Sequence, residues 1–482
     1  MTASPTKLVK KKLDQGGVSP LAAKNFLYQY DKLLRGETGL IPESEISPVK
    51  SAMKLSELES YRASGVEALK KLLVVKLNGG LGTSMGLSGA KSLLPAKNGL
   101  SFLDIALQQV LSNRERFKTA IPFVLMNSFH TESDSREILE RYPELRRGNG
   151  GLDLSFLQNK VPKISVATLT PAESPETKDL EWCPPGHGDL YPALFDSGLL
   201  EKALERGMDF LFVSNIDNLS STLDERILGY LATERLDFLM EVCSRTAADR
   251  KGGHIAQRLD GSLVLREIAQ CPAEDLESFQ DYERYSFFNT NSLWLNLRSL
   301  FDEISANDGV LRLPLIRNRK RLDPRDQNSD EVYQLETAMG AALECFKRSA
   351  IVQVPRTRFT PVKTTNDLLE LWSDVFTLDE NFSITNIRSE LKAKLVIDLD
   401  PKYFGRIDDF EKRFPFGSPS LVECDSLQVK GNWHFGRENC CRGEVELEGE
   451  GDLVYCLADR AELSGKITAQ SRFVKTHESN EV

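Results

Sequence analysis

The sequence predicts an α/β protein whose core is a buried parallel β-sheet. Between about residues 70 and 390, short apolar or β-branched runs alternate with stretches of helical character. This alternation is typical of parallel strands that are covered by helices on both faces. A glycine-rich segment follows the first of these runs directly. Because ligands bind at the carboxyl ends of the strands in such sheets, this segment is the first candidate for a binding site.

Five runs are predicted to be strands of this sheet, and the segment between the first two is predicted to be a helix. Apolar residues at helical spacing place the helix at residues 103–117. The expected strands are residues 73–77, 122–126, 164–167, 210–213 and 238–242. We assign residues 66–395 to the domain that holds this sheet.

The two ends of the chain differ from this central domain. Residues 1–65 are polar and helical in character, and they are predicted to form a helical N-terminal region. Residues 396–482 consist of short, strand-like runs that are punctuated by glycines. The spacing of Gly436, Gly443 and Gly449, by seven and six residues, indicates a stacked β solenoid with short rungs.

Composition and charge narrow the class of protein. The chain has 482 residues, with 61 Lys and Arg against 71 Asp and Glu, so its formal net charge is −10. A broad basic face for nucleic acid is therefore excluded, although a small anionic ligand needs only one local cluster of donors. No run approaches the roughly 20 apolar residues of a membrane span, and no secretory signal is recognisable. Eight dilute cysteines without CxxC spacing favour reduced thiols, so we expect a cytoplasmic protein.

The glycine-rich segment, residues 77–92, is suited to binding phosphate. Its five glycines within eleven positions let the backbone approach a ligand closely, and its exposed N–H groups can then bind phosphate oxygens. Lys91 adds a positive charge. Two common phosphate motifs do not fit, because Gly86 comes one residue late for the dinucleotide fingerprint and Ala90 and Met85 replace the Walker glycines. A glycine-rich surface loop without a ligand is the alternative.

The segment Leu-Asn-Gly-Gly-Leu-Gly-Thr-Ser-Met-Gly, which starts at Leu77, resembles the signature of the eukaryotic-type UTP–glucose-1-phosphate uridylyltransferases. The family continues with Cys-Lys-Gly-Pro-Lys, whereas this chain has Leu87-Ser88-Gly89-Ala90-Lys91 and keeps only the final Lys of the two. Further segments resemble the family in the same order: 126–129, 184–194, 213–219, 251–253, 265–270, 288–291, 335–338 and 362–365. The resemblance covers about residues 45 to 470.

Three side chains in these segments have two possible roles, although for Lys363 only the family resemblance implies the second role. His187, between two glycines of a sharp turn, is either a structural imidazole or a donor to a phosphate or sugar oxygen. Asp217 follows an apolar strand, and it either caps a turn or binds Mg²⁺. Lys363 is either an ordinary solvated lysine or a phosphate ligand.

The resemblance implies the activity, the fold and the role of each site residue. It implies transfer of uridylyl from UTP to glucose 1-phosphate, with Mg²⁺ as cofactor. It also implies a Rossmann-like, GT-A-like nucleotidyltransferase core with a mixed, mostly parallel sheet, a C-terminal left-handed β-helix, and a monomer or a homo-oligomer formed through that helix. The implied catalytic residues are Lys91 and Lys363, and the implied metal ligand is Asp217. The implied nucleotide-binding residues are Leu77, Asn78, Gly79, Gly80, Gln158, Gly186 and Asn215, and the implied sugar-phosphate-binding residues are His187, Gly253, Glu267 and Asn289.

Two alternatives stay open at this point. One is a UDP-sugar pyrophosphorylase with different or broader choice of sugar 1-phosphate. The other is a non-catalytic, nucleotide-sensing relative, for which the substitutions at residues 87, 88 and 90 are the only support. Retention of Lys91, Asp217 and Lys363 argues against it.

Overall fold

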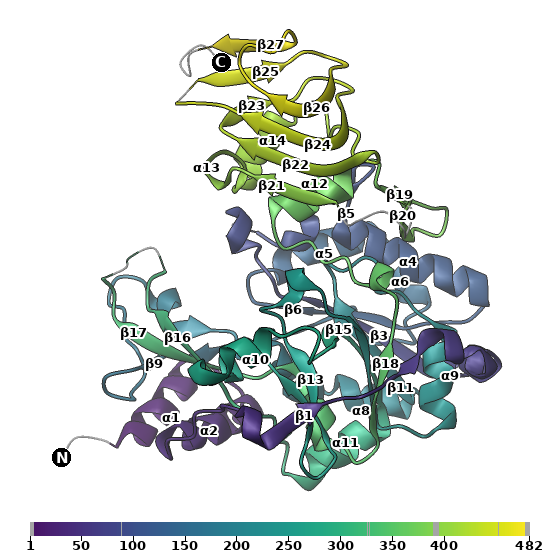
Figure 1. The fold of residues 1–482 in the computed structure, drawn as a ribbon. Coiled ribbons are helices and arrows are strands. Elements are labelled where there is room, and N and C mark those ends of the chain that lie inside the picture. The colour runs from purple at the N-terminus through teal and green to yellow at the C-terminus, as the bar shows by residue number, and fades with distance from the viewer. Residues whose placement is uncertain are drawn as a thin grey trace.

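A large mixed β-sheet forms the middle of the molecule (Figure 1). The computed structural model describes residues 4–87, 89–324, 326, 328–388, 395–451 and 453–477, so Ser88 of the glycine loop lies outside the described residues. The main path of the sheet runs in the order β2 (Met53–Lys54), β18 (Ser349–Gln353), β12 (Phe238–Ser244), β15 (Phe287–Asn296), β11 (Phe210–Asn215), β3 (Leu72–Asn78), β6 (Phe123–Asn127) and β7 (Ser155–Leu157). All neighbours on this path are parallel except β15, which is antiparallel to β11 and β12. An antiparallel extension beside β15 contains β13 (His254–Arg258), β14 (Leu263–Arg266) and β1 (Ile46–Pro48).

Alternate residues of the central strands pack on opposite faces of the sheet. Leu73 and Val75 of β3 belong to the hydrophobic cluster of one face, and Leu72 and Val74 belong to the cluster of the other. The first face is covered by α7 (Leu190–Asp196), α8 (Leu199–Glu205) and α11 (Leu297–Ala306). The second face is covered by α3 (Arg62–Ala68), α4 (Phe102–Phe117), α5 (Glu132–Glu140) and α9 (Glu225–Thr233). Because both faces are buried, the strands are apolar throughout, as their sequence indicates.

Four of the five predicted strands and the predicted helix are confirmed, as β3, β6, β11, β12 and α4. The prediction for residues 164–167 is confirmed only in part, because a strand forms at its first two residues but lies outside the central sheet. Ile164 and Ser165 form β9, which pairs with β17 (Glu331–Glu336) in a separate small sheet completed by β16 (Ile316–Arg321). Ile164 is apolar because it packs against the N-terminal helices, and β7 is the strand that takes the edge of the central sheet.

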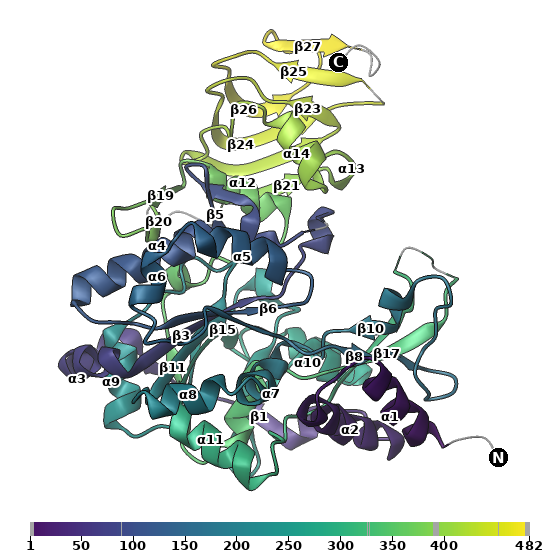
Figure 2. The same ribbon diagram turned by 180° about the vertical axis from the view of Figure 1, so that it is seen from behind.

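The N-terminal region begins with two helices, α1 (Pro5–Gln15) and α2 (Pro20–Leu34). They lie beside the small sheet and the antiparallel pair of β8 (Val161–Pro162) and β10 (Trp182–Cys183) (Figure 2). Ser19 caps α2, since its Oγ accepts a hydrogen bond of 3.1 Å from the Ala22 N–H. Strands β1 and β2 fall inside the predicted helical region and pair with the larger sheet, so this region is only partly helical.

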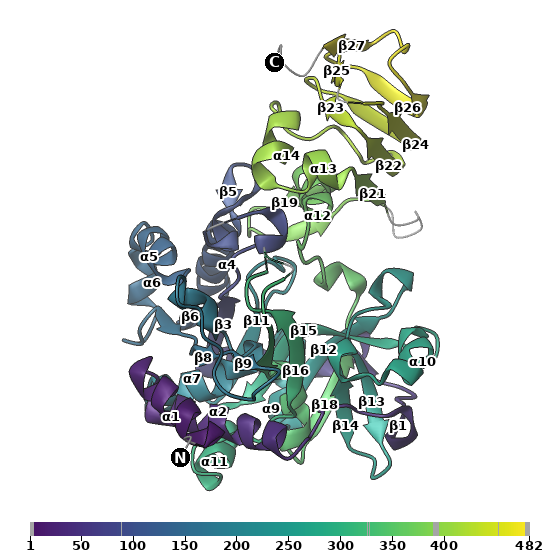
Figure 3. The same cartoon turned by 90° about the vertical axis from the view of Figure 1, so that its left-hand side faces the viewer.

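The C-terminal part of the chain is a stack of short parallel strands at one end of the molecule (Figure 3). Strands β21 (Val396–Leu399), β22 (Cys424–Lys430), β24 (Cys440–Glu448) and β26 (Glu462–Ile467) pair in chain order. A second layer contains β23 (Asn432–His434), β25 (Val454–Leu457) and the antiparallel β27 (Val474–His477). Parallel pairing of successive rungs agrees with the predicted solenoid. The left hand of the coil stays a prediction.

The remaining elements connect these parts. They are β4 (Pro95–Lys97), β5 (Leu100–Ser101), α6 (Glu144–Arg147), α10 (Leu276–Gln280), α12 (Thr365–Trp372), β19 (Phe376–Leu378), β20 (Ile384–Asn386), α13 (Pro401–Phe404) and α14 (Ile407–Arg413). Within the described residues, every helix is too short or too polar to cross a lipid bilayer.

A buried ion pair fixes the segment that leads from β18 to α12. The Glu241 carboxylate, on β12, accepts hydrogen bonds from Arg358 Nε at 2.8 Å and Nη2 at 2.9 Å. It also accepts one from the Trp294 indole N–H at 2.9 Å. The Glu241 side chain is 1% exposed, so both charges are removed from water and each depends on the other.

We expect Glu241→Gln to lower the free energy of unfolding by about 3 kcal/mol, because it leaves the Arg358 guanidinium buried without its main counter-charge. This loss is at the lower end for a broken buried pair because a second carboxylate, Asp224, lies 3.9 Å from Arg358 Nη1 and still offsets part of its charge. Urea unfolding followed by fluorescence measures the loss. Asp209→Asn, which breaks the exposed Lys71–Asp209 pair, is the control and should cost about 1 kcal/mol or less. Equal losses in the two variants would contradict this role of the buried pair.

Candidate active site

A cavity of about 310 Å³ lies at the carboxyl ends of β3, β6 and β11. Parallel pairing aligns these ends, since Leu77 is in register with Met126 on one side and with Asn215 on the other. Nine predicted site residues line the cavity: Leu77, Gly79, Gly80, Lys91, Gln158, Gly186, His187, Asn215 and Asp217. The other lining residues are Met126, Pro184, Ile216 and Glu336.

The glycine loop turns back on itself and delivers Lys91 to this cavity. Gly82 and Gly86 have φ angles of 60° and 74°, in the left-handed region that favours glycine. The Lys91 N–H donates a hydrogen bond of 3.1 Å to the Gly80 carbonyl, which closes the loop. Met85, at its tip, is fully buried in a hydrophobic cluster that it shares with α12 to α14 and the C-terminal strands.

Asn78 is the predicted nucleotide-binding residue of this loop that does not line the cavity. Its side chain is buried, and its Nδ2 donates hydrogen bonds of 2.7 Å to Asn127 Oδ1 and to Ser135 Oγ. It therefore ties the end of β3 to the end of β6 and to α5. These hydrogen bonds of the Asn78 side chain hold the start of the glycine loop in place.

Lys91, Asp217 and the segment that carries Lys363 meet at one point of the cavity wall. Lys91 Nζ lies 2.5 Å from Asp217 Oδ2 and also donates to the Val362 carbonyl. The Val362 N–H donates in turn to the Asp217 carbonyl at 3.3 Å. Lys363 and Thr364 directly precede α12, with Thr364 as its N-cap, and both backbone N–H groups donate to Asp367 Oδ2 at 2.8 Å.

Asp217 has an oxygen that suits a divalent cation. Its Oδ1 is buried and has no hydrogen-bond partner in the part of the chain that the structure describes, while Oδ2 pairs with Lys91. In the described part of the chain, no group of three or more His, Cys, Asp or Glu side chains could hold a metal. One carboxylate oxygen together with substrate phosphates is an environment that fits Mg²⁺, which usually takes one or two protein carboxylates.

His187 is held as a neutral hydrogen-bond donor. Its Nδ1 accepts a hydrogen bond of 3.0 Å from the Met339 N–H, so the ring proton resides on Nε2. Burial lowers the pKa of His187 to about 4, so the imidazole is uncharged at neutral pH. The ring belongs to the cavity wall, and its Nε2–H is the group that it can offer to an oxygen of a ligand.

The remaining four predicted residues form a neighbouring cluster. The Asn289 N–H donates to the Gly253 carbonyl at 3.2 Å, and a Cβ on Gly253 would lie 2.6 Å from the Glu267 carboxyl group. Burial raises the pKa of Glu267, and the positive charge of Lys363 opposes this shift, so these two side chains are electrostatically coupled. None of the four lines the described cavity.

The backbone of one short turn joins the cavity to this cluster. Met339, which binds His187, is followed by Gly340, where a Cβ would lie 3.1 Å from Asn289 Nδ2. The nucleotide side and the sugar side predicted from the sequence are therefore adjacent.

Comparison with known proteins now places the chain in a family. The sequence profile of UTP–glucose-1-phosphate uridylyltransferase matches residues 23–442. The chain belongs to the UTP–glucose-1-phosphate uridylyltransferase family. A family member from Encephalitozoon cuniculi is 37% identical over 451 residues, which cover 93% of this chain and 88% of that protein. A member from Solanum tuberosum is 36% identical over 457 residues, which cover 93% of each chain.

Solved structures of uridylyltransferases agree with this assignment. A crystal structure of a mutant Leishmania major UDP-glucose pyrophosphorylase in complex with UDP-glucose has a TM-score of 0.89 and 42% sequence identity, and covers 97% of this chain and 100% of that one. A structure from Trypanosoma brucei has a TM-score of 0.88 and 42% identity, with the same coverage. The resemblance found from the glycine loop is confirmed.

Glu336 is the charged residue among the four lining residues that sequence reasoning did not assign to the site. Two hydrogen bonds of 2.9 Å, from Thr337 N–H to the Pro185 carbonyl and from Gly188 N–H to the Thr337 carbonyl, bring the end of β17 against the turn that carries His187. Burial raises the pKa of Glu336. Residues 335–338 resemble the family, so the sequence does point to this segment. The contact between Glu336 and the His187 turn depends on tertiary structure and could not be read from the sequence.

A second lysine lies directly beneath the site. Lys76 is buried in β3, and its Nζ donates to Ser214 Oγ at 2.6 Å and to the Ser221 carbonyl at 2.8 Å. Burial, reinforced by the positive charge of Arg358, lowers the pKa of Lys76 to about 7. The unfolded chain has the ordinary lysine pKa, so between about pH 7 and 10.5 it binds a proton that the folded protein does not.

We expect the stability gained by Lys76→Met over the native protein to shrink as the pH rises from 7 to 10. Protonated Lys76 disfavours the folded state, and raising the pH removes this penalty at no more than about 1.4 kcal/mol per pH unit. Urea unfolding of both proteins across this range measures the difference. Lys71→Met, at an exposed position, controls for the loss of a lysine as such. A difference that stays constant with pH would show that Lys76 keeps its proton in the fold.

Proposed function

We propose that this protein transfers the uridylyl group of UTP to glucose 1-phosphate, giving UDP-glucose and pyrophosphate. The observation that carries the proposal is the convergence of Lys91, Asp217 and the Lys363 segment at one cavity wall. These are the groups that the family resemblance assigns to the phosphates and the metal. The reaction is reversible, because one phosphoanhydride bond is exchanged for another.

The chemistry requires positioning more than acid or base catalysis. An oxygen of the sugar phosphate attacks the α-phosphorus of UTP in line, and the bond from that phosphorus to the pyrophosphate oxygen breaks. The attacking oxygen is already anionic, so no group has to remove a proton from it. Holding the two reactants in a near-attack arrangement can supply roughly 7–11 kcal/mol.

The main obstacle is repulsion between two polyanions in a protein that is itself acidic. We assign Lys91 to the UTP phosphates and Lys363 to the sugar phosphate and the α-phosphate. Fixed positive charges of this kind stabilise the charge that develops on the equatorial and leaving oxygens. The Lys91 ammonium exchanges its bond with Asp217 for phosphate oxygens when the nucleotide binds.

The nucleoside is assigned to the wall formed by Gly79, Gln158 and Gly186. Gln158 Nε2 donates to the Gly186 carbonyl at 2.9 Å, and a Cβ on Gly79 would lie 2.9 Å from Gln158 Oε1. A side chain at position 79 would displace the Gln158 amide, so glycine there leaves room for the amide, which we assign to the edge of the uracil base. Leu77, Gly80 and Asn215 line the same cavity toward the phosphates.

Mg²⁺ is the proposed cofactor, with Asp217 as its protein ligand. The buried Oδ1 of Asp217, which has no hydrogen-bond partner among the described residues, supports the assignment. When bound, Mg²⁺ would supply positive charge to the phosphate oxygens of UTP and pyrophosphate. Breaking the Lys91–Asp217 pair frees the second oxygen of the same carboxylate.

The finer structural and cellular assignments belong to the same proposal. Stacked parallel rungs and the family resemblance support a left-handed β-helix over residues 396–482, a nucleotidyltransferase domain over 66–395 and an N-terminal region over 1–65. A cytoplasmic location, and a monomer or a homo-oligomer formed through the C-terminal part, remain predictions.

We expect Lys363→Ala and Asp217→Ala each to lower turnover by at least about 100-fold, because each removes a fixed charge from the reacting phosphates. Release of pyrophosphate from UTP and glucose 1-phosphate measures turnover, and Asp217→Ala should also raise the Mg²⁺ concentration needed for half-maximal rate. Lys70→Ala, an exposed lysine remote from the cavity, is the control. Near-native turnover in either purified, folded variant would remove that residue from the mechanism.

His187→Leu should lower kcat/KM by about 100-fold or more, because it removes the Nε2–H donor. His187→Gln keeps an N–H donor and should lose less. The imidazole is already neutral above about pH 5, so the shape of the pH–rate profile from pH 6 to 9 should be unchanged in His187→Gln. Equal rates for the Leu variant and the native protein would contradict a donor role.

Galactose 1-phosphate in place of glucose 1-phosphate tests the choice of sugar in the same assay.

A further inference from the structure

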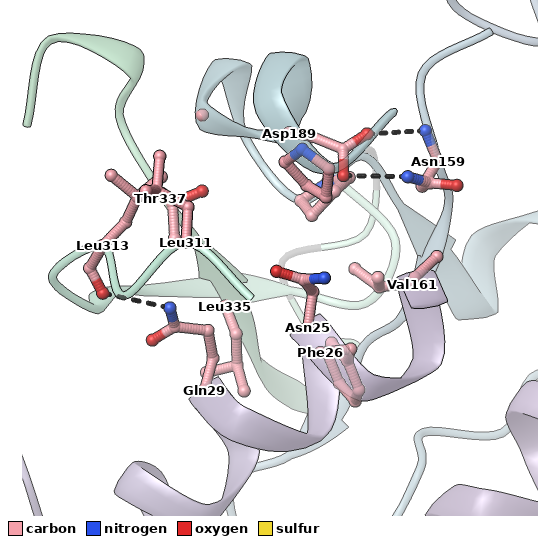
Figure 4. A pocket seen from close by; sticks show the side chains of 14 residues that line it. Asn25, Phe26, Gln29, Asn159, Val161, Asp189, Leu311, Leu313, Leu335 and Thr337 are labelled. Carbon is pink, nitrogen blue, oxygen red and sulfur yellow. Dashed lines mark hydrogen bonds between the residues drawn. The ribbon is translucent and has the colours of Figure 1, made fainter. Parts of the chain in front are cut away.

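The nucleoside wall of the cavity has a buried carboxyl group behind it. Asp189 ends the short turn His187–Asp189 and leads into α7, and only 5% of it is exposed. Figure 4 shows it facing Asn159 across the back of this wall. Because Asp189 does not line the cavity itself, it is outside the group that would touch UTP.

Asp189 holds Asn159 with both of its oxygens. Oδ2 accepts a hydrogen bond of 2.7 Å from the Asn159 backbone N–H, and Oδ1 accepts one of 3.0 Å from Asn159 Nδ2 (Figure 4). Asn159 directly follows Gln158. The carboxyl group therefore clamps together the two chain segments that form the nucleoside wall, one with Gln158 and the other with Gly186 and His187.

Gln158 needs such a support because of its position in the fold. It leaves β7, the last and shortest parallel strand at this edge of the sheet, and enters a loop before β8. Its own bonds are one from its N–H to the Asn127 carbonyl at 2.7 Å and one from Nε2 to the Gly186 carbonyl at 2.9 Å. The second bond has the right length only while the two segments keep their spacing.

The N-terminal helix α2 seals Asp189 from behind. A small cavity of about 30 Å³ lies between them, lined by Asn25, Phe26 and Gln29, and it has room for about one water molecule (Figure 4). Gln29 Oε1 is buried without a partner, so a water there would have a polar group to bind. The two groups that donate to Asp189 are both neutral amides of Asn159. Burial without a positive partner disfavours the ionised carboxylate. Burial raises its pKa to about 7.

We propose that Asp189 is a positioning residue for base selection: through Asn159 it sets the place of the Gln158 amide, which reads the uracil. The inference rests on the proposed function, in which Gln158 faces the base. The groups assigned to the phosphates, Lys91, Asp217 and Lys363, take no part in the two hydrogen bonds of this clamp. Selection of the base should change when the clamp is lost, while the rate of the chemical step should not.

The test compares Asp189→Ala, Asp189→Asn and the exposed control Asp153→Asn, which lies just before β7. For each protein, kcat and KM are measured with UTP and with CTP by pyrophosphate release, and the binding of both nucleotides is measured by calorimetry. In Asp189→Ala we expect the preference for UTP over CTP to fall at least about 10-fold, roughly the value of one lost hydrogen bond to a charged group. We expect kcat at saturating UTP and KM for glucose 1-phosphate to stay within about threefold.

Asp189→Asn keeps one acceptor oxygen and should lie between the native protein and Asp189→Ala. If Asp189→Ala does not fold, the Asn variant carries the test. A general loss of kcat with an unchanged UTP to CTP ratio overturns the proposal, because it would show a merely structural role. If the native protein binds UTP in preference to CTP but releases no pyrophosphate, the proposed function fails, and the binding ratio of the variants still decides the role of Asp189. A native protein with no preference for UTP overturns both.

Discussion

Parallel pairing of β3, β6 and β11 is the constraint on which the rest of the site depends. Because Leu77 is in register with both Met126 and Asn215, three strands end at one edge and open their following loops into one space. The first loop supplies glycines and Lys91, and the third supplies Asp217. Asn78 fixes two of these ends to each other by side-chain bonds, so the loops can vary in sequence while the edge that carries them stays in place.

Electrostatics explains how an acidic chain accommodates two polyanions. Positive charge is concentrated around one edge of the sheet: Lys91 in the wall, Lys363 at the start of α12, and Lys76 and Arg358 below the surface. Arg358 is neutralised by Glu241, and Lys76 is deprotonated more easily than an ordinary lysine because of its burial. Of these four cations, Lys91 lines the cavity with a side chain that is 13% exposed, and the family resemblance implies that Lys91 and Lys363 are the two that bind phosphates.

Local sequence patterns were enough to predict most strands of the central sheet. The features that were not predicted depend on contacts between segments that are distant in the chain. The apolar runs at β3, β6, β11 and β12 could be recognised because burial on both faces makes a strand continuously apolar. Ile164 has the same pattern for another reason, its packing against α1 and α2. Glu336 and Asp189 could not be assigned, because the role of each depends on a partner segment far along the chain. The antiparallel β15 could not be told from a parallel strand by composition.

Met85 packs across the boundary that the sequence predicts between the central domain and the C-terminal part. The tip of the glycine loop is fully buried in the same hydrophobic cluster as Phe404 and Trp433, more than 300 residues away along the chain. A chain cut at the predicted boundary would lose the part of this cluster that comes from residues 396–482, while Phe102 and Leu368 would remain in it. The glycine loop and the C-terminal rungs therefore share one hydrophobic cluster, so loss of the rungs would weaken the packing around the tip of the loop.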